Sequence, residues 1–584
     1  MTLQSTALAR VTIGLMQGIA LYLLQQAFEA KTWPATDGLI FAPLLVVAIF
    51  VPTVVVAGLG NMRPHTLAGW TAVATVVCAG LAIYNIFRDP TGGSAIQRVA
   101  PTPVLWLCLA AGLFITHSLI ASSDADRKLI ASYSRYFDMS WKQGVQLALA
   151  ACFVALFWAM LWLGAELFRL IKIELLADLI RRRWFWIPMT TLAFTYALHI
   201  TDMRAGLVRG TRTLTLSLLS WLLPVMTLIT IAFLLALPFT GLQALWSTRR
   251  ATAILLAAAA ALIFLINDAY QGGDVQETVA RIVRYSGTVA ALALIPVVVL
   301  AAYGLALRVG QYGWTPDRII ALACVAVAGC YALGYALAAV RRGTWLKSIE
   351  LTNVATAYII LAVLLALLTP IADPARLSVA DQVARLESGN LSPDQFDFVF
   401  LRFLSGRYGE QALERLKTKQ DGPNAGRISQ KANEALDWRT RAHAGPRVAR
   451  ATPQTRTANI TVLNSGAALP DSFVQQNWES MLRPYLLPRC LTADAKCEAV
   501  LADLDSDGTP EILLFTTPTG VSAAFHSTAD GRWVFLGAIA NANCAGVRDA
   551  LKAGRFETVT PLLKEIEANG QRLRVDGECA PPNR

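Results

Sequence analysis

Long apolar runs alternate with short polar segments over the first 373 residues of the chain. A helix needs about 20 apolar residues to cross the hydrocarbon core of a bilayer, and only helices and closed barrels satisfy their backbone there. The runs are too long and continuous for barrel strands, so they predict a polytopic α-helical membrane protein with about eleven transmembrane helices. The predicted crossings are Val11–Phe28, Leu39–Leu59, Leu67–Phe87, Val104–Ala121, Val145–Phe168, Trp184–Ile200, Leu214–Leu237, Ala251–Ile266, Val289–Leu307, Ile319–Val340 and Val354–Ala372.

The apolar pattern stops at LTPIADP, residues 368–374, and a tail of soluble composition follows. Arg376–Glu387 is helical in pattern, and Ser392-Pro393 suit the start of a second helix that reaches Leu416, because serine caps helices and proline fits their first position. Beyond a polar, basic segment the pattern predicts a C-terminal soluble α+β domain. Its predicted helices are Asp471–Tyr485 and Thr492–Leu504, and its predicted strands are Ile512–Phe515, Val521–Phe525 and Trp533–Ile539.

Four parts are therefore expected: a transmembrane helical domain over 1–373, membrane-proximal helices over 374–417, a linker over 418–459 and an α+β domain over 460–584. Residues 1–373 carry 26 Lys and Arg against 16 Asp and Glu, whereas residues 374–584 carry 25 against 24. A basic excess confined to the membrane half fits anionic lipid. Nucleic acid is not expected as a partner, because it would need a basic soluble face. The lipid bilayer is the partner that the sequence predicts, and it identifies no protein partner.

The tail holds four cysteines, Cys490, Cys497, Cys544 and Cys579. Proximity favours the pairs Cys490–Cys497 and Cys544–Cys579. A zinc site is the alternative, although the spacing lacks a CxxC knuckle and nearby histidines. Disulfides persist in oxidising compartments, so we expect the tail outside the cytoplasm, and eleven spans then place the N-terminus in the cytoplasm. On this topology the cytoplasmic side holds 14 Lys and Arg and the outer side 12, because the loop Arg169–Arg183 is basic. The positive-inside bias is therefore weak.

The acidic stretch DLDSDGTPEI, residues 503–512, has the composition of a calcium-binding loop. Carboxylates at alternate positions can face one cation, and Gly508 permits the sharp turn that such loops need. Leu514 occupies the position of the usual bidentate glutamate, so the loop is not an EF-hand and is more similar to the DxDxDG loops of extracellular repeats. A metal-free turn capped by its own carboxylates is the alternative. The candidate Ca²⁺ ligands are Asp503, Asp505, Asp507, the Thr509 carbonyl and Glu511.

A few polar groups lie within or near the ends of the predicted spans, where ionisable side chains are costly and often functional. Near span ends these side chains can also reach the interface at little cost. For residues 310–318, GQYGWTPDR, helix capping is a second alternative, with Thr315 as the cap and Pro316 at the first position. The candidates for a polar membrane site are His117, His199, Asp268, Gln311 and Asp317.

Five passages of the chain are distinctive: GLMQGIALYLLQQ, WPATDGLIFAPLL, LLALPFTGLQALW, RVGQYGWTPDRIIALACVAVAGCYALGYALAA and TPIADPARLSVADQVARLESGNLSPDQFDFVFLRF. Together they resemble the bacterial membrane-protein family described as domain of unknown function 4153, over about residues 10–410. The resemblance implies a multi-span inner-membrane protein and brings no reaction and no catalytic residues. It does not extend to the part from Ile460 onward.

The chain contains no GxxxxGK[ST], HExxH, GxSxG or Rossmann fingerprint, so ATP-driven transport and standard hydrolase chemistry are not expected, and we do not favour an enzyme. The leading hypothesis is an envelope scaffold or sensor with a ligand- or Ca²⁺-binding periplasmic tail. A secondary transporter of a small solute is one alternative, because proline-broken spans are typical of transporters. A membrane-embedded transferase is another, with Glu174 and Asp178 as the acidic residues of an outer loop.

Overall fold

The computed structural model describes residues 3–88, 99–242, 250–271, 281–341, 345–438, 451–463, 467–478, 487–492, 495–516, 522–528, 530–542, 544, 546–556, 559, 566–568 and 571–573. The chain divides into two compact units, Met1–Arg441 and Ala442–Arg584. Each unit has hydrophobic cores of its own.

The first unit is helical throughout. Ten helical segments among its described residues are long and apolar enough to cross a membrane, so the chain is a polytopic helical membrane protein. Its helices are α1 (Leu3–Ala30), α2 (Gly38–Gly58), α3 (Pro64–Arg88), α4 (Pro103–Asp126), α5 (Tyr133–Leu170), α6 (Leu175–Arg181), α7 (Arg183–Met203), α8 (Ala205–Ser220), α9 (Leu222–Thr240), α11 (Ala251–Tyr270), α12 (Arg281–Tyr312), α13 (Pro316–Val340), α14 (Ile349–Leu367), α15 (Pro374–Glu387), α16 (Phe398–Phe403), α17 (Gly406–Lys417) and α18 (Ala425–Asp437).

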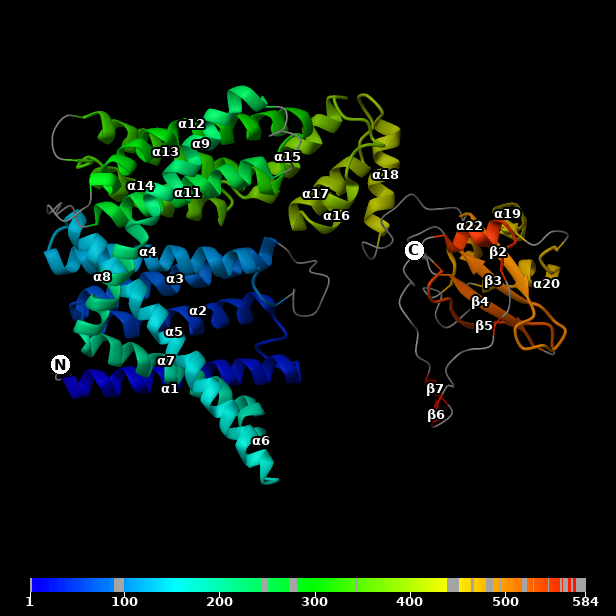
Figure 1. The fold of residues 1–584 in the computed structure, drawn as a ribbon, viewed down its shortest axis with the longest axis horizontal. Helices are drawn as coiled ribbons and strands as arrows, with labels where there is room; N and C mark the ends of the chain where they lie inside the picture. The colour runs from blue at the N-terminus through cyan, green and yellow to red at the C-terminus, as the bar shows by residue number, and fades with distance from the viewer. Residues whose placement is uncertain are drawn as a thin grey trace. The chain divides into compact units, whose positions relative to one another are not determined.

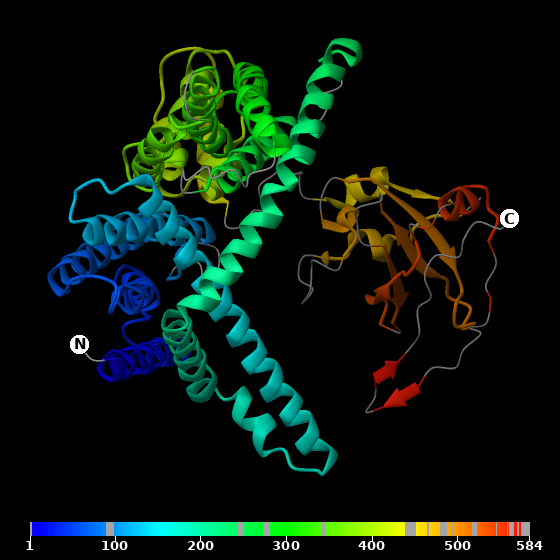
Figure 2. The same ribbon diagram turned by 60° about the vertical axis from the view of Figure 1, so that its left-hand side comes forward.

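The membrane helices form two groups (Figure 1). The first bundle consists of α1–α5 and α7, and the second bundle consists of α9 and α11–α14. In the first bundle α2, α3 and α4 share a core that includes Trp70 and Leu109. In the second bundle α11, α12 and α13 share a core that includes Leu262, Leu294 and Tyr335. Between them in sequence, α8 and α9 follow one another as a long rod (Figure 2), which is the predicted span around Leu214–Leu237.

Helix α7 is not one of the ten candidate spans, yet it packs along α1. At one end of this pair Arg10 of α1 bonds Asp202 of α7 at 2.8 Å, and at the other end Glu29 pairs with Arg183. The α1 residues of these two pairs are about 28 Å apart along a helix that rises 1.5 Å per residue, which is close to the hydrocarbon thickness of about 30 Å. We therefore count α7 as an eleventh crossing, antiparallel to α1.

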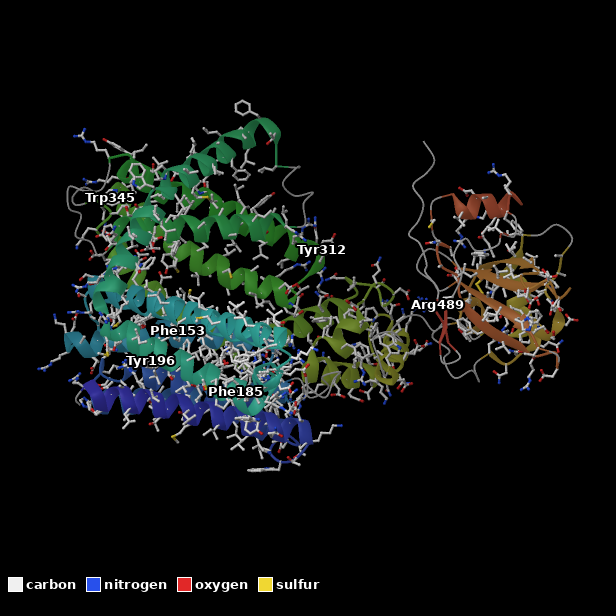
Figure 3. The ribbon with its side chains drawn as sticks, turned by 60° about the horizontal axis from the view of Figure 1, so that its bottom comes forward. Phe153, Phe185, Tyr196, Tyr312, Trp345 and Arg489 are labelled. Atoms are coloured by element: carbon white, nitrogen blue, oxygen red, sulfur yellow. A yellow bond between two sulfur atoms is a disulfide. The ribbon has the colours of Figure 1, made fainter. Side chains whose placement is uncertain are left out.

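These two ion pairs define the two ends of the membrane unit. The basic residues Arg181–Arg183 lie at the end marked by Glu29, opposite Arg10, which is the side that the eleven-span topology predicts for this loop. Figure 3 shows Trp345 and Tyr312 at opposite ends of the second bundle, with Tyr312 at the end that meets α15–α18. We refer to these ends as the Arg10 end and the Glu29 end.

Helices α15–α18 form a small helical body at the Glu29 end, which we call the collar (residues 374–438). Its core includes Val383, Leu401, Leu413 and Ile428, all at most 1 % exposed. Helix α15 covers the predicted Arg376–Glu387 helix. The predicted single helix from Ser392 is instead two, α16 and α17, because the chain turns before Phe398 and again after Phe403.

Helix α18 lies inside the range 418–459 that the sequence pattern assigns to a linker. Its apolar positions Ile428, Ala432 and Ala435 are fully buried in the collar core, so residues 425–437 are a packed helix rather than a linker. The polar and basic composition of this segment reflects its one exposed face. Residues 439–450, the middle of the predicted linker, lie outside the described part of the chain.

The second unit, which we call the distal domain (residues 442–584), has an α+β fold. A five-stranded sheet has the order β1-β2-β3-β4-β5, with β1 parallel to β2 and the other pairs antiparallel. Strands β6 and β7 form a separate hairpin. The elements are α19 (Pro453–Asn459), β1 (Ile460–Val462), α20 (Asp471–Gln475), α21 (Arg489–Thr492), β2 (Cys497–Ala502), β3 (Glu511–Phe515), β4 (Ala523–Ser527), β5 (Trp533–Ala538), α22 (Val547–Lys552), β6 (Ile566–Ala568) and β7 (Gln571–Leu573).

Both faces of this sheet are covered. Alternate residues of a strand point to opposite faces, so Ile512 and Leu514 join the larger core with Phe473 and Trp478, whereas Phe515 joins a smaller core that includes Leu551 of α22. The predicted helix Thr492–Leu504 is wrong, because most of it is strand β2. Its sequence CEAVLA suits a helix locally, but pairing with β1 on one side and β3 on the other decides the outcome.

Candidate functional sites

The acidic loop joins β2 to β3 in the distal domain. Asp503 accepts hydrogen bonds from the backbone N–H groups of Ser506 at 2.7 Å and Gly508 at 3.0 Å. Asp505 accepts one from Asp507 N at 3.2 Å, and Asp507 accepts one from Thr509 N at 2.7 Å. These bonds curl the backbone around the carboxylates, and Ser506 and Gly508 take positive φ values of 64° and 87° to allow it.

Glu511 and His526 close the base of this loop. The Glu511 side chain is 2 % exposed and accepts a hydrogen bond from Leu504 N at 2.7 Å. Its other oxygen lies 3.1 Å from His526 Nδ1 on β4. His526 was not among the sequence-predicted ligands, because only the pairing of β3 with β4 brings it to the loop.

Two overlapping sets of side chains in this loop are close enough to share a cation: Asp503, Asp505 and Glu511, and Asp505, Asp507 and His526. Within each set the ligand atoms lie within 4.8 Å of one another. The hydrogen bond to Glu511 raises the pKa of His526 above its ordinary value. Hydrogen bonds from Thr509 lower the pKa of Asp507 below its ordinary value. The structure records the backbone N–H of Thr509 as a hydrogen-bond donor to Asp507. Carboxylate and carbonyl oxygens, such as those of this loop, are the ligands that Ca²⁺ prefers.

Disulfides staple the distal domain near this sheet. Cys490 of α21 and Cys497 of β2 are bonded to each other, with Cα atoms 5.9 Å apart. Cys544 is also disulfide-bonded, and Cys579, its predicted partner, lies outside the described residues. The free cysteines of the described chain, Cys78, Cys108, Cys152, Cys324 and Cys330, all belong to the membrane helices.

At the Arg10 end of the first bundle, several polar side chains bond to one another, although Arg10 Nε and His117 Nε2 are buried without a partner among the described residues. Asp202 bonds Arg10 at 2.8 Å and Lys142 at 3.0 Å, and His199 Nδ1 lies 3.5 Å from Arg10. His117 accepts a hydrogen bond from the indole N–H of Trp70 at 3.1 Å. His117, Arg10 and Asp202 all line a cavity of about 190 Å³, so the structure brings His117 and His199 into one polar neighbourhood.

Asp268 lies elsewhere, in a larger cavity of about 1090 Å³ between the two bundles. Asp317 lines the same cavity from the first turn of α13, at the Glu29 end. Gln311 and Asp317 are therefore not part of the His117 neighbourhood. The structure divides the five predicted polar residues into three places rather than one site. Glu174 and Asp178 are exposed on or next to α6 and line neither cavity among the described residues.

The turn between α12 and α13 is a docking point for α15. Asp381 accepts a hydrogen bond from Trp314 N at 2.8 Å, and Ser378 donates one to Trp314 O at 3.0 Å. Gln382 donates to the carbonyls of Tyr312 and Trp314, both at 3.0 Å. Thr315 does begin α13, although its side chain makes no capping bond. The main chemical role of the GQYGWTP segment is therefore to bind the collar.

Asp373 links the collar to the first bundle. Its carboxylate is fully buried and caps α15 by accepting a bond from Ala375 N at 2.8 Å. The other carboxylate oxygen accepts a bond from the Tyr84 hydroxyl at 2.7 Å and lies 3.5 Å from Arg88. Tyr84 also contacts the hydroxyl of Tyr408 on α17 at 3.0 Å. The collar thus binds α3 of the first bundle and the α12–α13 turn of the second.

A family model described as Domain of unknown function (DUF4153) matches residues 39–416, which is more than half of the chain. The chain belongs to the DUF4153 family. No curated protein and no solved structure matches it. The DUF4153 match begins at α2 and ends in the last turn of α17, so it includes the first bundle apart from α1, the second bundle and most of the collar. The distal domain, with its acidic loop and disulfides, lies outside the match.

In this DUF4153 protein, two of the distinctive passages that carry the family resemblance bind to each other. QYGWTP forms the α12–α13 turn, and SVADQ in α15 supplies the side chains that bond to it. The roles of Asp373 and Asp381 could not be inferred from sequence, because their partners lie 67 to 289 residues away. The sequence indicates only that both residues lie within one of the passages that resemble the family.

Proposed function

We propose that this DUF4153 protein is a scaffold or sensor of the bacterial cell envelope, in which an extramembrane part controls the spacing of the two helical bundles. The observation that carries the proposal is the attachment of the collar to both bundles by partly buried, directional polar contacts. Asp373 bonds Tyr84 of the first bundle, and Asp381 bonds Trp314 of the second. A movement of the collar would therefore be transmitted to both bundles, because one bond holds α3 and the other holds the α12–α13 turn.

The same proposal assigns the collar and the distal domain to the periplasm of an inner-membrane protein. Disulfides at Cys490–Cys497 and at Cys544 support an oxidising compartment. Eleven crossings support a cytoplasmic N-terminus opposite the collar. A phosphatase fused after Asp437 is expected to be active, since this reporter works only outside the cytoplasm, and an inactive fusion would reverse the orientation.

The proposed ligand of the distal domain is Ca²⁺, held by carboxylates of the loop 503–511. The support is the closeness of Asp503, Asp505 and Glu511, whose oxygens lie within 4.8 Å of one another. Affinities of about 10⁻⁴ to 10⁻³ M are typical of extracellular calcium modules. Such a site would be occupied or emptied by changes in the envelope rather than in the cytoplasm.

The collar proposal is tested by measuring the distance between the bundles. Spin labels at Ile83 on α3 and Leu322 on α13, both lipid-facing and about 45 % exposed, report the Glu29 end by double electron–electron resonance in a background without the five free cysteines. We expect Asp373→Asn and Asp381→Asn together to broaden this distance distribution. Asp394→Asn is the matched control, because Asp394 bonds only within the collar. An unchanged distribution in the double variant would contradict the proposal.

A cellular test separates the extramembrane part from the spans. In a strain lacking the gene, a chain without residues 390–584 is expected to insert into the membrane but to fail to reverse the defect that loss of the gene causes. Full restoration by that chain would reject a sensing role for the extramembrane part.

One observation favours a second candidate, a secondary transporter of a small solute. The cavity of about 1090 Å³ is lined by helices of both bundles, and transporters commonly bind their substrates between two halves of the protein. Substrate-dependent uptake into proteoliposomes that Asp268→Asn abolishes would support this candidate over the scaffold.

A further inference from the structure

The cavity between the bundles has the size and walls of a ligand pocket. Helices α4 and α5 line it from the first bundle, and α11, α13 and α14 line it from the second. Its volume of about 1090 Å³ is slightly above the range of roughly 300 to 1,000 Å³ that is typical of small-molecule sites. Most of its lining residues are apolar or aromatic.

Asp268 is an exception among these walls. Asp268 is among the residues that line the cavity, it is 1 % exposed, and its Oδ2 is buried without a hydrogen-bond partner in the described part of the chain. None of the ion pairs formed by the described residues includes it. A buried carboxylate without a partner is costly, so a ligand that supplies the missing partner would be bound with corresponding strength.

The polar neighbours of Asp268 are already committed to one another. Asn353 donates to Asn267 Oδ1 at 2.6 Å, Tyr335 donates to Asn353 Oδ1 at 2.6 Å, and Asn267 donates to Tyr335 Oη at 2.7 Å. Tyr133 bonds to the same ring through Asn267 Oδ1 at 3.2 Å. Asn353 also donates to the Tyr133 hydroxyl at 3.2 Å, so these four side chains are bonded to one another and none of these bonds reaches Asp268.

Aromatic rings continue from Asp268 along the wall. Phe264 lies one helical turn before it on α11, so both side chains are on the same face, and both line the cavity. The centroid of Phe264 is 6.5 Å from that of Trp141, which is 6.3 Å from Phe137. Phe137 is in turn 6.2 Å from Tyr133. A carboxylate at the end of a row of aromatic faces is suited to an organic cation, because ring faces attract positive charge.

We propose that this cavity binds an organic cation with an apolar body. The cationic centre pairs with Asp268, and the apolar body packs against Phe264, Trp141 and Phe137. A divalent metal ion fits less well, since it needs several oxygen ligands and the nearby amides and hydroxyls are bonded to one another. A neutral lipid chain would fill the volume but leave the carboxylate without a partner. The proposal rests on Asp268 and the aromatic side chains of α5 and α11 rather than on the bonds of Asp373 and Asp381, although collar residues such as Pro374 and Ser405 line another part of the cavity.

Radiolabelled tetraphenylphosphonium is a direct probe, because it combines a permanent positive charge with four phenyl groups. The full-length protein in detergent is expected to bind it saturably. Asp268→Asn is expected to weaken binding at least about tenfold, since it removes one partner of a buried charge pair. Asp268→Glu retains the charge and should retain most of the binding. Asp317→Asn is the matched control, because Asp317 lines the same cavity at its other end.

Triphenylphosphine oxide distinguishes a cation site from a merely apolar one, because it carries similar phenyl groups without a net charge. Competition by the neutral compound as strong as by unlabelled tetraphenylphosphonium would overturn the proposal. So would wild-type binding by Asp268→Asn, or loss of binding by Asp317→Asn in place of Asp268→Asn. This competition uses the wild-type protein alone, so it decides the question even if Asp268→Asn fails to fold.

Discussion

The collar and the distal domain are both soluble parts that follow the last span, but they use their polar side chains differently. Asp373, which caps the first helix of the collar, and Ser378 and Asp381 within the collar bond to membrane helices or to the turn between them. In the distal domain, Asp503 and Glu511 bond to backbone groups of their own hairpin. The collar is therefore built as a part of the membrane unit, and the distal domain as a unit with its own cores and disulfides.

The family match ends at residue 416 in α17, before the last helix of the collar. The end of the apolar pattern at residues 368–374 marks where the chain leaves the bilayer. It does not mark where the family match ends. The match therefore covers most of the collar and none of the distal domain.

The largest single-residue effect is expected at Asp373. Asp373→Ala removes the cap of α15 and leaves Tyr84 and Arg88 without their carboxylate partner. Breaking a buried, hydrogen-bonded charge pair costs about 3 kcal/mol or more. The melting temperature of the purified protein should fall accordingly. Asp394→Ala, at the exposed collar surface, is the control. An equal effect of both variants would show that the buried carboxylate of Asp373 contributes no more to stability than a surface carboxylate.

A smaller effect is expected where the collar meets the α12–α13 turn. Gly313 has a φ of +73°, and a Cβ there would lie 2.6 Å from Asp381 Oδ2. Gly313→Ala should cost about 1 to 2 kcal/mol through backbone strain alone and disturb the α15 contact. Gly310→Ala is the matched control, since a Cβ at Gly310 meets nothing within 4 Å. Chemical denaturation of the two variants side by side measures the difference, and equal stabilities would show that α15 does not need this turn.

Calcium is expected to act on the distal domain alone. At ten times its dissociation constant, Ca²⁺ should stabilise this domain by about 1.4 kcal/mol and leave the unfolding of the membrane unit unchanged. Asp505→Asn should reduce the effect, whereas Asp530→Asn, in the β4–β5 turn, should not. Calorimetry with Ca²⁺ and with a chelator makes this measurement. Stabilisation that survives Asp505→Asn would place the ion elsewhere.

The smallest effect concerns acid. The hydrogen bond from Lys431, at 2.6 Å, holds the pKa of Asp394 below its ordinary value. A lowered folded-state pKa means that this bond stabilises the collar above the ordinary pKa of about 4 and is lost as pH falls through the lower, folded-state pKa. Amide exchange in α18 should therefore differ between wild type and Asp394→Asn at pH 6, and this difference should vanish near pH 2.5. A difference that persists in acid would assign it to another group.

The sequence was sufficient for the features that depend on local pattern. The spans could be predicted because each is a continuous apolar run, and strand β3 because residues 512–515 follow a turn signal. The predicted tail helix Arg376–Glu387 matches α15 for the same reason. The DUF4153 family could be recognised from its distinctive passages.

Features that depend on contacts between residues far apart in the chain could not be predicted from the sequence. His526 reaches the acidic loop only through strand pairing. Strand β2 resembles a helix until β1 and β3 flank it. Asp268 could be noted as a membrane carboxylate, but its lack of a partner depends on how Asn353 and Tyr335 from other helices bond to Asn267 instead.

The collar is part of the membrane unit, and the distal domain is a separate unit. The thermal stability of the full chain can be compared with that of chains ending at residue 441 and at residue 373, by size-exclusion chromatography after heating. We expect the chain ending at 441 to keep the midpoint of the full-length membrane unit, and the chain ending at 373 to lose its folded peak at much lower temperature. Equal stability of these two truncated chains would show that the membrane helices do not need the collar.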